Sequence, residues 1–198
     1  MNRMNFEKET TGDVEKQERP GVLYHASHNP AIEEFVPRQD RVRDPNEGPR
    51  VFATPDKALA SIFLIAGQND DWIQSGYLND VPIVVVCMER EEFIAHDKGG
   101  AIYVLPSDGF DFDPNLGLRD KEWTNPNGVK PLGKIGCESA PDTMIENGVQ
   151  VYFVDKTTFD AIDQAENFGV DILTRLESEN QRRGVNVQDF QMDSKSSF

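Results

Sequence analysis

The chain has 198 residues and a formal net charge of −15, with 20 Lys and Arg against 35 Asp and Glu. A surface that neutralises nucleic-acid phosphates is basic, so this charge balance argues against an extended nucleic-acid-binding surface. The longest apolar run, 83–88, is far shorter than the roughly 20 residues of a membrane span, and no signal-like segment opens the chain. The two cysteines have neither disulfide-framework nor zinc spacing. These features predict a soluble, cytoplasmic protein without membrane contact.

Both ends of the chain are polar and have no hydrophobic period. Residues 1–20 and 181–198 carry almost no net charge and few large apolar side chains, so we predict a flexible N-terminal arm and a flexible C-terminal tail. Residues 21–180 are then one folded α+β domain, and this domain holds the acidic excess.

Short apolar runs bounded by Gly and Pro predict the strands. The run 82–88 is continuously apolar and β-branched, which is typical of a strand covered on both faces. Further strands are predicted at 22–25, 50–53, 101–105 and 149–154. A weaker candidate within 129–135 is interrupted by Pro131.

Helix signals are fewer than strand signals. Thr54 is a good N-cap and Pro55 suits the first helical position, which predicts a helix to about residue 66. Other helices are predicted at 140–147, from Thr157 or Thr158 onward, and at 170–179. Helices and strands follow in a mixed order, which favours an α+β fold with mainly antiparallel strands.

Three segments carry residues with chemistry. His25 ends the first predicted strand, where a side chain can point into a cleft. Its spacing from His28 is compatible with metal ligation, but no third ligand follows, and a structural histidine is the alternative. The strand-to-helix junction at 50–58 could hold an anion such as phosphate on its backbone N–H groups.

The third segment holds two acidic residues. On an extended segment Asp120 and Glu122 point to the same face. Such a pair can orient a sugar hydroxyl and stabilise developing positive charge, and a solvated charged edge strand is the alternative. The Gly-rich dinucleotide fingerprint, the P-loop and nucleophile-elbow context are absent from the sequence.

In this order the three segments resemble the ADP-ribosyltransferase-like superfamily, which includes diphtheria-toxin-like and poly(ADP-ribose) polymerase-like enzymes. Leu-Tyr-His-Ala-Ser at 23–27 is similar to the signature of the first strand in that fold. The segment 51–63 resembles the strand that leads into a helix, and 120–123 resembles the later strand that presents the catalytic Glu. The resemblance covers roughly 22–154. It implies mainly antiparallel, split β-sheets with short flanking helices.

The resemblance also implies the activity of an NAD-dependent ADP-ribosyltransferase, with NAD as co-substrate and an unknown protein or nucleic-acid acceptor. It implies that Glu122 binds the ribose 2′-hydroxyl and stabilises the oxocarbenium-like transition state, and that His25 binds the same ribose. The other NAD-binding residues that it implies are Ala26 at the nicotinamide amide, Phe52 and Phe63 at the ring, Thr54 at the strand–helix junction, and Arg38 or Arg50 at the diphosphate.

Two alternatives stay open at this point. Glu138 is a competing carboxylate near the start of a predicted helix, and Asp120 is shorter than the Gln or Glu usual two residues before the catalytic Glu. The alternative function is a non-catalytic acidic binding module on the same scaffold, which acts on a basic protein partner.

Overall fold

The computed structural model describes residues 17–39, 48–65, 72–117, 121–165, 167, 169–183 and 189–191. The described chain forms two compact units, each presented here by itself. The first unit joins the residues up to Leu64 with Gly100–Cys137, and the second joins Ile65–Gly99 with the residues from Glu138 onward. The boundaries predicted at 20 and 180 stay predictions.

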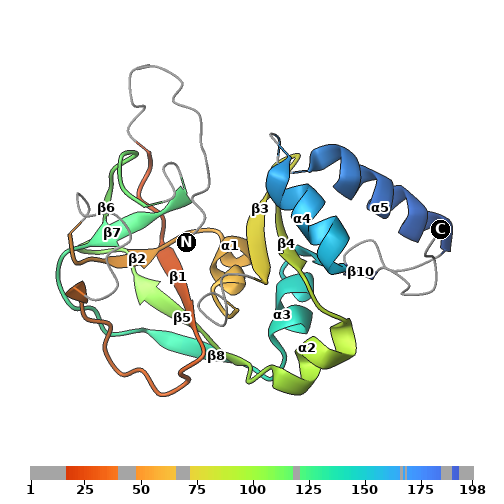
Figure 1. The fold of residues 1–198 in the computed structure, drawn as a ribbon. Coiled ribbons are helices and arrows are strands. Elements are labelled where there is room, and N and C mark those ends of the chain that lie inside the picture. The colour runs from red at the N-terminus through yellow and green to blue at the C-terminus, as the bar shows by residue number, and fades with distance from the viewer. Residues whose placement is uncertain are drawn as a thin grey trace. The chain divides into compact units, whose positions relative to one another are not determined.

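The first unit contains two small antiparallel sheets (Figure 1). One has the order β1-β5-β8 and the other the order β2-β7-β6. The backbone of Tyr24 in β1 pairs with Thr54, directly after β2, and this bridge joins the two sheets. The elements are β1 Val22–Ser27, β2 Val51–Ala53, α1 Lys57–Ile62, β5 Gly100–Pro106, β6 Asp111–Phe112, β7 Trp123–Asn125 and β8 Gly133–Cys137.

One face of these strands forms the core of the first unit. Alternation along a strand sends every second side chain to the same face, so Leu23, Tyr103 and Leu105 gather there. Phe35, from the loop after β1, packs edge-on against Tyr103 with ring centroids 5.0 Å apart. The Tyr103 hydroxyl donates to the carbonyl of Asn29 at 2.7 Å and accepts from the N–H of Ile32 at 3.0 Å. The loop is thereby fixed over the sheet.

Replacing Tyr103 by Phe removes this hydroxyl and leaves the ring in the core. We expect a loss of about 1–2 kcal/mol in the free energy of unfolding, because two backbone groups lose a partly buried partner. The Ile32 amide should exchange faster with solvent deuterium. Tyr152→Phe is the control, since the Tyr152 hydroxyl binds the Gln150 side chain in the second unit. Unchanged Ile32 exchange in Tyr103→Phe would contradict the expectation.

The second unit contains a four-stranded sheet of order β10-β9-β4-β3. Its central β4 and β9 run parallel, and β3 and β4 form an antiparallel hairpin. Asn79 and Asp80 link β3 to β4 with φ of 51° and 63°, the signs that a type I′ turn requires. The elements are β3 Ile73–Leu78, β4 Val81–Val86, α2 Arg90–His96, α3 Ala140–Glu146, β9 Gln150–Phe153, α4 Lys156–Gln164, α5 Val170–Arg183 and β10 Asp189–Gln191.

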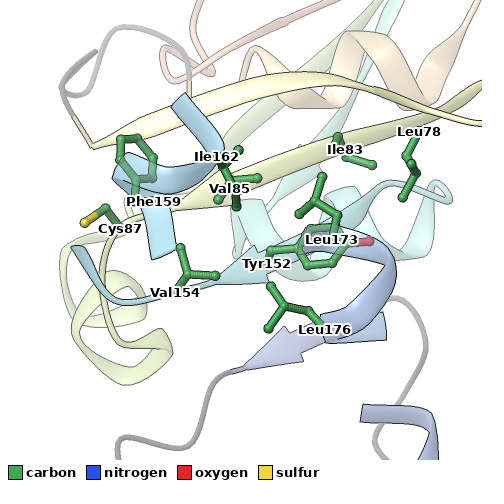
Figure 2. Packing of buried hydrophobic residues seen from close by; sticks show 10 residues of the cluster. All are labelled: Leu78, Ile83, Val85, Cys87, Tyr152, Val154, Phe159, Ile162, Leu173 and Leu176. Atoms are coloured by element: carbon green, nitrogen blue, oxygen red, sulfur yellow. The ribbon is translucent and has the colours of Figure 1, made fainter. Parts of the chain in front are cut away.

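Figure 2 shows the core between this sheet and helices α4 and α5. Ile83 and Tyr152 from the sheet meet Ile162 of α4 and Leu173 of α5, and all four are fully buried. Burial raises the pKa of the Tyr152 hydroxyl, which donates a hydrogen bond to Oε1 of Gln150 at 3.1 Å. Burial also raises the pKa of the Cys87 thiol in the same cluster. These polar groups are therefore neutral core components.

The predicted α+β class is confirmed as a mixture of helices and small, largely antiparallel sheets. The strands predicted at 22–25, 50–53, 82–88, 101–105 and 149–154 correspond to β1, β2, β4, β5 and β9, and the weak candidate overlaps β8. Helix α5 continues beyond the predicted range 170–179 to Arg183. After it, β10 pairs parallel with β9. Among the described residues, no helix has the length and apolarity needed to cross a bilayer.

Two predicted helix starts are wrong, because an Asp at another position caps each helix. The N-cap of α1 is Asp56, not Thr54, and its carboxylate accepts from the N–H groups of Ala58 and Leu59 at 2.9 and 3.3 Å. Likewise Asp155 caps α4, which begins at Lys156. In α1 the shift follows from strand pairing, because the carbonyl of Thr54 accepts from the N–H of Tyr24, whereas the N–H of Ala58 bonds to Asp56.

Candidate functional site

Within the first unit, Tyr24 in the middle of β1 pairs with Thr54, the residue that directly follows β2. The N–H of Tyr24 donates to the carbonyl of Thr54 at 2.7 Å, and the N–H of Thr54 donates back to Tyr24 at 3.0 Å. On the other side of β2, Phe52 is paired with Thr124 and Ala53 with Trp123. The printed pairing of β2 with β7 ends at Ala53 and Trp123, so Thr54 and Glu122 are the residues that directly follow β2 and directly precede β7.

His25 is fixed against β2 by its own ring. Its Nδ1 lies 2.7 Å from the carbonyl oxygen of Phe52. A carbonyl oxygen only accepts, so Nδ1 carries the proton in this bond, and in the neutral ring Nε2 is the acceptor nitrogen. The ring also lies 4.6 Å from the Phe35 ring at an interplanar angle of 58°. These two contacts define both the tautomer and the orientation of a half-buried histidine.

Glu122 has little solvent exposure for a carboxylate. Its relative exposure is 3%, and the residue stands immediately before β7. Glutamate is rarely buried to this degree, because removing a carboxylate from water costs free energy that other interactions must offset. Glu138, the competing carboxylate, is exposed and belongs to the second unit. Burial next to β7 makes Glu122 a better candidate than Glu138 for a carboxylate shielded from water. Asp120 lies outside the described residues.

The two faces of the β2–β7 ribbon differ in character. Val51, Ala53 and Trp123 belong to the core of the first unit. Period-two alternation directs Phe52 and its partner Thr124 to the opposite face. Arg50 extends this second face, with its Nη1 3.4 Å from Oγ1 of Thr124. An apolar ring, a hydroxyl group and a guanidinium thus share one face of this part of the sheet.

The other residues predicted to bind NAD lie outside the paired strands β2 and β7. Ala26 is buried in β1 opposite Ile102. Phe63 is the half-buried C-cap of α1, a helix that packs on β1. Arg38 is exposed in the loop after β1. Their roles toward NAD stay predictions.

The anion site predicted on the backbone at 50–58 has no support in the geometry. The Asp56 carboxylate already accepts hydrogen bonds from the first free N–H groups of α1, and its negative charge opposes a phosphate there. For the described residues, no group of three or more His, Cys, Asp and Glu side chains has an arrangement that could hold a metal ion. The pairing of His25 with His28 as metal ligands therefore stays without a third ligand.

Sequence reasoning assigned no role to Tyr24, Thr124 or Trp123. Tyr24 is part of the quoted first-strand signature, but only its pairing with Thr54 shows that it joins β1 to the end of β2. Thr124 becomes relevant through its register with Phe52. The alternation of side chains along each segment could have indicated which residues share a face. The pairing between segments distant in the sequence could not be predicted from a single sequence.

Comparisons of the chain with protein-family models, with curated proteins and with solved structures found no match.

Proposed function

We propose that the protein is an NAD-dependent ADP-ribosyltransferase whose site involves β1 around His25, the end of β2 and the start of β7. The links among these strands carry the proposal: His25 bonds to Phe52 of β2, and Glu122 directly precedes Trp123, which pairs with Ala53 of β2. The first unit would accordingly have the split sheet arrangement of the ADP-ribosyltransferase-like fold. Its two sheets meet at the Tyr24–Thr54 bridge, which supports this interpretation.

The chemistry needs a carboxylate beside a ribose. In the transfer, the bond between ribose C1′ and the nicotinamide nitrogen breaks, and nicotinamide leaves with the electron pair. A nucleophilic atom of the acceptor bonds to C1′ and loses its proton to solvent. Positive charge develops on the ribose ring, and a fixed carboxylate shielded from water stabilises that charge more strongly than a solvated one. Glu122, 3% exposed, meets this requirement.

The remaining residues fit the other parts of the co-substrate. The acceptor nitrogen of His25 suits a ribose hydroxyl, because its Nδ1 proton is committed to Phe52. The Phe52 ring offers apolar surface for the nicotinamide. Arg50 lies on the same face and has the planar fork that binds a diphosphate. In a chain of net charge −15, such a local cation offsets the repulsion of an anionic substrate.

The proposal is tested by incubating the full chain with NAD labelled separately in nicotinamide and in adenine. We expect release of labelled nicotinamide, and transfer of the adenine label when a suitable acceptor is present. If neither occurs with protein or nucleic-acid acceptors, the enzymatic proposal is wrong. A melting temperature that millimolar NAD does not raise would then favour the non-catalytic acidic module, because a ligand that binds only the folded state must stabilise it.

A further inference from the structure

Arg19, three residues before β1, contacts three parts of the first unit. Its Nη1 donates to the carbonyl oxygen of Ser107 at 2.6 Å, and its Nη2 lies 3.7 Å from Oδ1 of Asp111 in β6. Its guanidinium carbon lies 5.7 Å from the centroid of the Trp123 ring in β7. One side chain thus joins the segment before β1 to the end of β5, to β6 and to β7.

Trp123 connects this contact to the candidate site. The residue is 4% exposed, and its ring lies 5.7 Å from the Phe112 ring. Its backbone is paired with Ala53 on one side and with Phe112 on the other. Glu122 directly precedes Trp123, the first paired residue of β7. The position of the Glu122 carboxylate therefore depends on how firmly Trp123 is held.

We propose that Arg19 is a positioning residue for Glu122, an inference that rests on the proposed function. Arg19 contacts the ring of Trp123, and Glu122 is the residue next to Trp123 in the chain. The ion pair with Asp111 is not sufficient for this role, because the two side chains are 46% and 81% exposed and such pairs are weak. The guanidinium can present its face to an indole while its edge donates to a carbonyl, which a lysine ammonium cannot reproduce.

The first test does not depend on catalysis. The chain has two tryptophans, so a Trp72→Phe background leaves Trp123 as the single tryptophan, which can be excited selectively over the tyrosines. We expect Arg19→Ala to raise acrylamide quenching of Trp123 about twofold, because local opening exposes the ring. Arg19→Lys should be intermediate. Asp111→Asn, which removes only the long ion pair, should leave quenching unchanged. Unchanged quenching in Arg19→Ala would overturn the inference.

The second test separates positioning from a merely structural role. We expect Arg19→Ala to lower kcat for nicotinamide release about 10-fold, since small misplacements of a catalytic group are costly. The KM for NAD should change little, and Arg19→Lys should restore part of kcat. A wild-type kcat in Arg19→Ala, with an active wild-type enzyme, would refute the positioning role. An inactive wild-type chain would instead refute the proposed function, and the positioning role with it.

Discussion

Replacing Glu122 by Gln is expected to abolish most NAD turnover while leaving the fold intact. Gln keeps the shape and one acceptor oxygen but has no negative charge to stabilise the developing positive charge on the ribose. Loss of one preorganised electrostatic partner costs about 10²- to 10³-fold in kcat. Because this interaction strengthens in the transition state, KM for NAD should change far less than kcat. Nicotinamide release under saturating NAD measures the effect.

Glu138→Gln is the matched control for this substitution. Glu138 is exposed and lies in the second unit, so its kcat should equal that of the wild type. Circular dichroism and thermal melting of both variants establish that they fold. If Glu138→Gln is inactive and Glu122→Gln retains activity, the site assignment is wrong and the function stands. If both variants turn over NAD like the wild type, neither carboxylate is catalytic.

Gly100→Ala is expected to destabilise the first unit strongly. A Cβ at this position would lie 2.3 Å from the carbonyl oxygen of Ser27 and 2.9 Å from Cα of His28. Both are backbone atoms, so they cannot rotate away as a flexible side chain would. The φ of 155° is also unfavourable for an L-residue. We expect a loss of about 2–4 kcal/mol in the free energy of unfolding, the range of severe overpacking.

The consequences of Gly100→Ala should reach the candidate site. Ser27 ends β1, the strand that carries His25, so displacement of its backbone shifts the His25–Phe52 contact. NAD turnover should fall together with stability. Gly136→Ala is the control within the same sheet, because nothing lies within 4 Å of a Cβ there. We expect it to change stability by no more than about 0.5 kcal/mol. Equal unfolding midpoints for the two variants would contradict the steric argument.

The strands that sequence reasoning predicts are those whose own residues form a continuous apolar run. β4, with three consecutive valines, is an example. β7 has only three residues, Trp-Thr-Asn, and becomes a strand through pairing with β2 and β6. β3 likewise lacks a strong apolar run, although the Asn79–Asp80 turn before β4 was a local signal for a hairpin. Pairing over long sequence distances determines such elements, and a single sequence does not display it.

The candidate site likewise combines features that the local sequence predicts with features that only the tertiary structure shows. Local pattern predicted His25 at the end of a strand, but β1 continues to Ser27 and His25 lies inside it. Phe52 lies in the next strand, as predicted. The hydrogen bond between these two residues, 27 positions apart, and the pairing of Ala53 with Trp123 next to Glu122 are tertiary contacts. The burial of Glu122 is also a tertiary property, because the same residue on an edge strand would be solvated. The prediction of Thr54 as the N-cap of α1 was wrong although its local signal was good, because Thr54 pairs with Tyr24 instead.

The proposed NAD-binding site comprises β1 around His25, the end of β2 and the start of β7. The most direct test is two-dimensional NMR of the full chain, titrated with an NAD analogue whose glycosidic bond cannot be cleaved. We expect the largest amide shift changes at His25, Ala26, Thr54 and Trp123, with smaller changes at Thr124. An unperturbed spectrum, or changes confined to the second unit, would contradict the claim.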